Sequence, residues 1–197
     1  GVTVITVLSS MFAGYAISQL RFPMRRPLYW LILASFMVPT QVLIINHFVL
    51  MANMGLLNTW AGIILPQLIH PVVIIVYKQF FDQVPKDFRE AAVMDNTSEL
   101  GILFKIYMPM NWGVTTALSI VTFIWSWNAF LWPFLAVTKT EMMTITVGIT
   151  QVNDAFGVYY ARQLSAAVLA GFPVAAAYLL FQRRVTQAIT LSAGIKG

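Results

Sequence analysis

Five long apolar blocks are the feature that most constrains how this chain can fold. At about 1.5 Å of rise per residue, a helix of each block would cross a hydrocarbon core of roughly 30 Å. Charged residues make up only 10% of the chain and gather between the blocks, whereas soluble domains average about 25%. The blocks are residues 2–20, 28–51, 60–80, 114–137 and 164–181. The sequence therefore predicts an all-α membrane protein, a polytopic helical bundle with five spans.

The lysines and arginines between the blocks favour one orientation, because cytoplasmic loops carry an excess of these residues. Nine of these basic residues lie in the first connecting segment, in the third connecting segment or in the C-terminal tail. Only Lys139 and Arg162 lie in the other connections, and Lys78 lies at the end of a block. We therefore expect the first and third connections and the C-terminus on the cytoplasmic side. Gly1 leads almost directly into an apolar block, without the basic region of a signal peptide. A further span is expected before it, which makes six in the full protein.

The residue types that usually carry chemistry are scarce. The chain has no cysteine, two histidines and seven acidic residues, none of which lies within an apolar block. An ion-coupled carrier usually keeps a carboxylate in its spans, so that alternative is disfavoured but stays open. An intramembrane enzyme is disfavoured because the chain lacks a Gly-x-Ser-x-Gly elbow and a histidine-rich zinc motif. The net charge of +5 is scattered along the chain, so a nucleic-acid surface is not expected. No metal site is expected either, because the chain has no cysteine and its two histidines lack the spacing of a zinc helix.

Small and polar residues within the blocks have two interpretations. Two series of small residues spaced four apart predict close helix contacts: Ser10, Gly14 and Ser18, and Ala167, Gly171 and Ala175. Hydroxyls at helical spacing from Thr115 onward share one helix face, which is typical of packing and is also suited to a polar pathway. The weak candidates for a substrate pathway are Asn46, Gln67, Ser119, Thr122, Ser126 and Asn128. Prolines in four of the five blocks predict kinked or broken helices.

Residues 82–112 form the one stretch with the composition of a soluble domain, since five of the seven acidic residues lie in it. Pro85 favours a helix start. The mostly apolar stripe that follows at helical spacing consists of Phe88, Ala91, Ala92 and Asp95. Asn96 tolerates the left-handed conformation that ends helices, and Thr97 or Ser98 can cap a second helix. The stripe of that second helix runs up to Pro109 and consists of Leu100, Leu103, Phe104 and Tyr107.

Two short amphipathic helices need cover for their apolar faces. The bilayer surface, or the bundle of the chain itself, is one possible cover. A partner protein is the other, because Ala91 and Ala92 are small enough to let a second backbone come close.

Residues 89–98, Arg-Glu-Ala-Ala-Val-Met-Asp-Asn-Thr-Ser, with Gly101 and Pro109 downstream, resemble the EAA loop of ABC-importer permeases. Further segments extend the resemblance across nearly the whole chain, to the carbohydrate-uptake branch that includes the smaller permease of the maltose transporter. These segments are YAISQLRFP at 15–23, VPTQ at 38–41, GLLNTW at 55–60, WNAF at 127–130 and AGIKG at 193–197. Asn96 and Met24 stand where this family usually has glycine.

The resemblance implies the transmembrane-domain fold of an ABC type I importer over residues 1–197, in a bacterial or archaeal cytoplasmic membrane. The EAA loop at 82–112 would dock on a cytoplasmic ABC ATPase dimer. A second homologous permease would complete the pathway, and an extracytoplasmic binding protein would deliver a sugar or related solute. The coupling residues carried onto this sequence are Glu90, Ala91, Ala92, Asp95, Asn96 and Gly101.

The division of labour also follows from a motif that the chain lacks. It contains no G-x-x-x-x-G-K-[ST] phosphate loop, so it is not expected to hydrolyse ATP. No cofactor is expected on this chain, and ATP and Mg²⁺ would bind to the partner ATPase.

Overall fold

The structure, a computed structural model, describes residues 1–151 and 160–194, and of 182–194 it describes only the helical backbone. In that part of the chain the regular structure is helical and contains no strand, which confirms the all-α prediction. The chain divides into two compact units. We call the first, Val4–Val38, Ile69–Ser119 and Arg183–Gly197, the loop unit. We call the second, Gly1–Thr3, Pro39–Leu68 and Ile120–Gln182, the short-helix unit.

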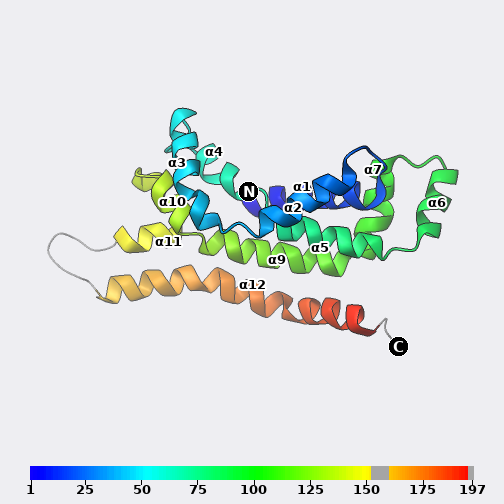
Figure 1. Ribbon diagram of the computed structural model, residues 1–197. Coiled ribbons are helices and arrows are strands. Elements are labelled where there is room, and N and C mark those ends of the chain that lie inside the picture. The colour runs from blue at the N-terminus through cyan, green and yellow to red at the C-terminus, as the bar shows by residue number, and fades with distance from the viewer. Residues whose placement is uncertain (152–159, 195–197) are drawn as a thin grey trace. The chain divides into compact units, whose positions relative to one another are not determined.

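The elements can be followed along the chain in Figure 1. The first half contains α1 (Val2–Gln19), α2 (Arg25–Phe36), η1 (Thr40–Leu43), α3 (Ile44–Asn53), α4 (Trp60–Ile64), η2 (Leu65–Gln67) and α5 (Pro71–Asp82). The connecting loop contains α6 (Lys86–Met94), α7 (Glu99–Ile102), the π-helical turn η3 (Leu103–Tyr107) and α8 (Met108–Met110). The remainder contains α9 (Trp112–Asn128), α10 (Leu131–Ala136), η4 (Thr140–Met142), α11 (Ile145–Gly148), η5 (Ile149–Gln151) and α12 (Tyr160–Gly194).

The predicted spans are only partly continuous helices. α1 and residues Tyr160–Phe181 of α12 are long and apolar enough to cross a membrane. The blocks 28–51 and 60–80 are each divided between two helical segments, and counting each pair as one span gives up to four. The predicted number of five spans therefore stays a prediction. The breaks fall beside Pro39 and Pro71, where a proline has no backbone N–H to continue a helix.

The block 114–137 is divided between two helices, because α9 ends at Asn128 and α10 begins at Leu131, and this confirms the break that a proline in the block predicts. Pro133 explains the break. It has no N–H to donate to the carbonyl of Ala129, four residues earlier. The Thr146 hydroxyl donates to that carbonyl oxygen instead, at 2.8 Å. The carbonyl that Pro133 leaves without its helical donor is therefore still paired.

The core of the loop unit forms where α1 lies against α5. Tyr77 and Phe81 of α5 are fully buried with Tyr107, and the ring centroids of Phe81 and Tyr107 are 5.5 Å apart. Gly14 of α1 allows the close approach, because a Cβ there would lie 2.6 Å from the Cβ of Tyr77. Between apolar helices such packing depends on van der Waals contact, which small residues make possible. The predicted contact at Ser10, Gly14 and Ser18 is confirmed.

In the short-helix unit, one turn holds several short helices together. Asn58 adopts a left-handed φ of 58°. Its side-chain Oδ1 accepts hydrogen bonds from the backbone N–H groups of Thr138 and Lys139, at 2.7 and 3.2 Å. The indole of Trp132 donates to the Gly62 carbonyl at 3.1 Å, from a core shared with Met51 and Ile63. Residues 55–60 therefore have a structural role in this unit, as the turn that is hydrogen-bonded to the connection after α10.

Candidate functional site

The candidate site is the connecting loop, whose first helix, α6, begins and ends as its sequence predicts. Pro85 directly precedes the helix, and Asp87 lies in its first turn, where a negative charge is favourable. Asn96 follows the helix with a φ of 55°. The N–H groups of Asn96 and Thr97 donate to the carbonyls of Val93 and Ala92, at 3.0 and 2.9 Å. This pair of bonds is a Schellman motif, which satisfies the last carbonyls of a helix.

The next helix, α7, resolves the alternative left open at its start. Ser98 is the cap, because its hydroxyl accepts the backbone N–H of Gly101 at 3.2 Å. A Cβ at Gly101 would lie 2.8 Å from the Cγ2 of Thr97, so glycine gives the cap the space it needs. The predicted second helix is found as α7 and η3, and α8 carries it past Pro109 to Met110. A proline is tolerated there because it lies in the first turn of α8.

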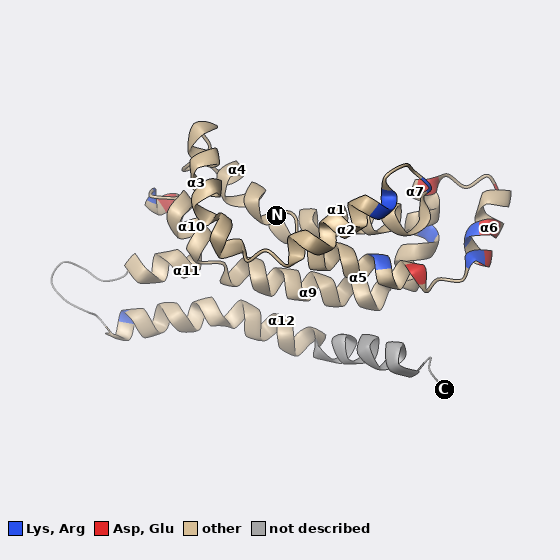
Figure 2. Cartoon of the chain, in the orientation of Figure 1, with Lys and Arg blue, Asp and Glu red and all other residues tan. Residues whose placement is uncertain are grey.

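The apolar stripe predicted on α6 is mostly exposed, so the described part of the chain covers little of it. Only Ala92 is buried, in the core around Tyr107. Glu90, Ala91 and Asp95 are exposed. Phe88, Val93 and Met94 are also exposed, at 49%, 48% and 82%. Helix α6 therefore presents a mixed apolar and charged surface that no described residue of the chain covers, while Ala92 anchors it. Figure 2 shows the charges gathered on this helix.

A polar junction joins α6 and α7 to α1. The guanidinium of Arg89 forms an ion pair with one carboxylate oxygen of Glu99. The Tyr15 hydroxyl donates to the other oxygen at 2.6 Å. The sequence analysis did not identify this junction, because Tyr15 and Glu99 are 84 residues apart and no motif relates them. We call Tyr15, Arg89 and Glu99 the Glu99 junction.

A second set of hydrogen bonds lies one helical turn further along α1. The Tyr107 hydroxyl donates to the side-chain oxygen of Gln19 at 2.7 Å, and the Ser18 hydroxyl donates to Asp82 at 2.7 Å. Burial raises the pKa of Tyr107 above its usual value, a shift that Arg89 opposes and that the nearby Glu99 and Asp82 carboxylates increase. Tyr107 therefore stays a neutral donor at physiological pH.

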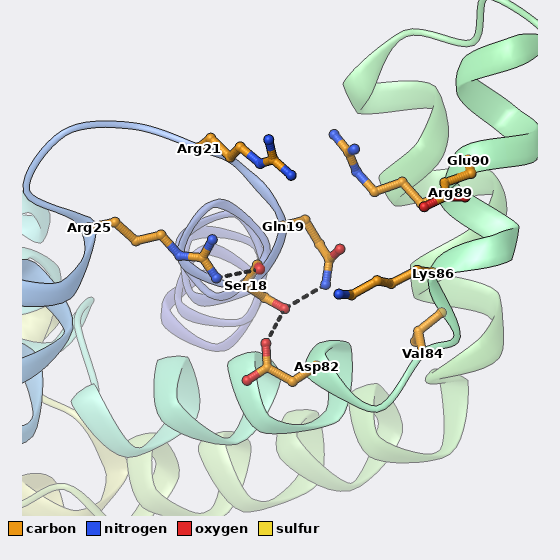
Figure 3. A pocket seen from close by; sticks show the side chains of 9 residues that line it. All are labelled: Ser18, Gln19, Arg21, Arg25, Asp82, Val84, Lys86, Arg89 and Glu90. Atoms are coloured by element: carbon orange, nitrogen blue, oxygen red, sulfur yellow. Dashed lines mark hydrogen bonds between the residues drawn. The ribbon is translucent and has the colours of Figure 1, made fainter.

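A charged hollow of about 440 Å³ opens beside this polar cluster (Figure 3). Four cations and two carboxylates face it, and its lining residues are Ser18, Gln19, Arg21, Arg25, Asp82, Val84, Lys86, Arg89 and Glu90. Arg25 is held in place because it donates to the Ser18 carbonyl at 2.6 Å. The EAA residue Glu90 thus lies at the edge of a mostly basic surface formed by α1, α6 and the segments next to them.

The six predicted pathway residues differ in their local surroundings. None of the six lines the charged hollow. Ser119 and Gln67 donate to backbone carbonyls of their own helical segments, at 2.7 and 2.8 Å. The hydroxyl of Thr122 is buried without a hydrogen-bond partner among the described residues. Ser126 is half-buried, and Asn46 and Asn128 are exposed. Their role in a pathway stays a prediction.

Comparison with known proteins shows which family the chain comes from. The profile of the family described as "Binding-protein-dependent transport system inner membrane component" matches residues 5–189. The chain belongs to this family. It is a permease subunit of an ABC importer and an inner-membrane component, and it is not an enzyme. Such a permease works with an ATPase and with a solute-binding protein. Membership of this family excludes the alternative that the sequence analysis left open, an ion-coupled carrier.

Curated relatives cover nearly the whole chain. AraQ, the permease protein of an arabinooligosaccharides transport system from Halalkalibacterium halodurans, is 31% identical over 100% of this chain and 70% of AraQ. LacG, the permease protein of a lactose transport system from Rhizobium radiobacter, is 32% identical over 94% of this chain and 68% of LacG. UgpE, the permease protein of an sn-glycerol-3-phosphate transport system from Yersinia enterocolitica, is 32% identical over 92% of this chain and 66% of UgpE.

A solved structure agrees in fold. One chain of a bacterial ABC transporter involved in the import of the acidic polysaccharide alginate superposes with a TM-score of 0.76 at 24% identity. The match covers 92% of this chain and 70% of the other. The predicted importer fold is thereby confirmed.

Proposed function

We propose that residues 82–112 couple this permease to its ATPase subunits, with α6 as the helix that the ATPase contacts. The observation that carries the proposal is the combination of an exposed apolar and charged surface on α6 with an anchor beneath it. Phe88, Val93 and Met94 are open to a partner. Ala92 and the Glu99 junction hold the helix to α1 and to the core of the loop unit. A contact on α6 would therefore move this framework as a body.

The EAA residues have different roles in this proposal. Glu90, Ala91 and Asp95 are exposed and would contact the ATPase. Ala92, Asn96 and Gly101 act from within the loop, because they pack, close the Schellman motif and make room for the cap. ATP and Mg²⁺ bind to an ATPase dimer, and its closure would pull on α6. A second homologous permease would complete the pathway, and rigid-body motion would expose the solute site to each side of the membrane in turn.

We infer that the solute is a sugar or a related polyol derivative. The names of AraQ, LacG and UgpE refer to arabinooligosaccharides, lactose and sn-glycerol-3-phosphate. The candidate pathway residues Asn46, Gln67, Ser119, Thr122, Ser126 and Asn128 supply hydroxyls and amides. These groups can exchange hydrogen bonds with sugar hydroxyls.

The coupling role can be tested by co-purifying the ATPase with tagged permease. Glu90→Lys and Ala91→Trp alter exposed positions, so the fold of the loop should survive. Disruption of the centre of a protein interface commonly costs about 2 kcal/mol or more. We therefore expect the amount of ATPase that co-purifies with each variant to be less than about one tenth of the wild-type amount. Glu141→Lys reverses an exposed acidic residue on η4 and should retain the wild-type amount. Full retention by both loop variants, with normal uptake, would rule out α6 as the docking helix.

A further inference from the structure

A second hollow lies beside the first turns of α2, within the loop unit. It has a volume of about 420 Å³ and is lined by Ile17, Arg25, Arg26, Tyr29, Trp30 and Lys78. Three of these six residues are cations, and none of the described lining residues is acidic. We call it the Arg26 hollow. Figure 2 shows basic positions at the start of α2 and towards the end of α5.

The charges around the Arg26 hollow are not fully compensated. Arg25 donates to two backbone carbonyls at the end of α1, those of Ser18 and Leu20, and so stays beside the hollow. Lys78 pairs with Asp82, and its ammonium lies 4.7 Å from the centre of the Tyr29 ring. Arg26 has no acidic partner in the described part of the chain. Three cations against one carboxylate leave two positive charges, which makes the hollow attractive to an anion.

Apolar surface continues directly from these charges. No residue of α2, which is described throughout, is buried. Leu28, Trp30 and Leu31 are exposed at 41%, 68% and 65%. Tryptophan is enriched at the level of the headgroups, where its ring is apolar and its N–H remains polar. The helix thus begins with arginines, continues with an aromatic pair and then offers an aliphatic surface.

We propose that the Arg26 hollow binds the headgroup of an anionic phospholipid. The phosphodiester would accept hydrogen bonds from Arg26 and Lys78, the Trp30 ring would lie at the ester level, and the acyl chains would lie along Leu28 and Leu31. An amphiphile fits better than a free anion, because charge and exposed apolar surface adjoin on one helix. Basic pockets next to spans are a recognised way of binding such headgroups. The inference concerns α2 and α5 and does not depend on the coupling role of α6.

Retained lipid can be counted on the purified permease–ATPase complex by native mass spectrometry, after exposure to micelles of phosphatidylglycerol or of phosphatidylcholine with the same acyl chains. We expect preferential retention of phosphatidylglycerol. Each cation near an anionic lipid contributes about 1 kcal/mol, so Arg26→Gln should weaken that retention about fivefold. Arg26→Lys should preserve most of it. Trp30→Leu should weaken retention of both lipids. Lys105→Gln removes an exposed charge that lines neither hollow and should match the wild type.

Three results would overturn the proposal. Equal retention of the two lipids would show that the charges do not select an anion. Displacement of phosphatidylglycerol by inorganic phosphate at similar concentration would indicate a site for a soluble anion. The chain has no cysteine, so Trp30→Cys places a single thiol in it. Efficient cross-linking of that thiol to another subunit would show that a protein covers this face of α2. Failure of cross-linking, with selective retention of phosphatidylglycerol, supports the lipid.

Discussion

Glu99 is the residue on which the attachment of the coupling loop depends. One carboxylate oxygen pairs with Arg89 of α6, and the other accepts a hydrogen bond from Tyr15 of α1. Glu99 itself begins α7, where a negative charge is favoured by the helix dipole. A single carboxylate therefore joins three helices. Ala92 contributes by size, because it is buried where a larger side chain would have to displace the core.

Tyr15→Phe tests this junction at the scale of one hydroxyl group. The variant keeps the ring and removes the 2.6 Å hydrogen bond to Glu99. Hydrogen bonds to charged groups contribute about 1.5–3 kcal/mol, so we expect a lower melting temperature of the purified complex. We also expect fewer solute molecules transported per ATP hydrolysed. Tyr178→Phe, at an exposed position of α12, is the control for loss of a tyrosine hydroxyl. A wild-type melting temperature for Tyr15→Phe would mean that the bond adds nothing to stability.

At the scale of elements, helix ends in this protein follow from the pairing of backbone groups. Asn96 ends α6 because two N–H groups return to the carbonyls of its last turn. Pro133 ends the run of α9 because it cannot donate to Ala129, and Thr146 supplies the missing donor. Close contact between whole helices has a different origin, namely the absence of a side chain at Gly14.

Gly14→Ala should separate α1 from α5. The added Cβ would lie 2.6 Å from the Cβ of Tyr77 and 3.1 Å from the backbone nitrogen of Lys78, neither of which is the flexible end of a side chain. Overpacking of this kind typically costs about 1–3 kcal/mol, and a thermal melt of the complex should show the loss. Gly171→Ala is the matched control within α12, because no described atom lies within 4 Å of its added Cβ. Equal melting temperatures for the two variants would contradict the close packing at Gly14.

At the scale of the whole molecule, the loop unit combines all the parts that the proposed coupling requires. It contains α6 and α7, together with α1 and α5, against which they are anchored. Outside α12, the charged residues of the unit lie near helix ends or in the connecting loop, as the distribution of lysine and arginine along the chain predicts. The orientation of this unit in the membrane is the property that this distribution should determine.

Cysteine accessibility can test the orientation, because the chain has no cysteine of its own. Lys105 and Lys139 are both exposed, one in the loop and the other in the connection after α10. The excess of nine basic residues over two predicts that they face opposite sides. In intact cells, a membrane-impermeant maleimide should label Lys139→Cys and leave Lys105→Cys unlabelled, and inverted vesicles should reverse the pattern. Labelling of Lys105→Cys in intact cells would overturn the assigned orientation.

The sequence by itself determined the features that depend on neighbours along the chain. The apolar blocks, the start of α6 after Pro85, the left-handed turn at Asn96 and a cap at Thr97 or Ser98 follow from residues within one or two helical turns. The EAA motif identified the family for the same reason, because its residues are contiguous. Local interactions of this kind can be read from spacing alone.

The tertiary structure decided what depends on residues far apart. It selected Tyr15 as the partner of Glu99, buried Ala92 alone from the predicted stripe and supplied Thr146 to the carbonyl freed by Pro133. Residues 82–112 could be predicted as two helices, but their anchor could not, because one carboxylate can pair with any donor that the fold brings near. Periodicity describes which side of a helix is apolar. Only the packing of other helices decides how much of that side is covered.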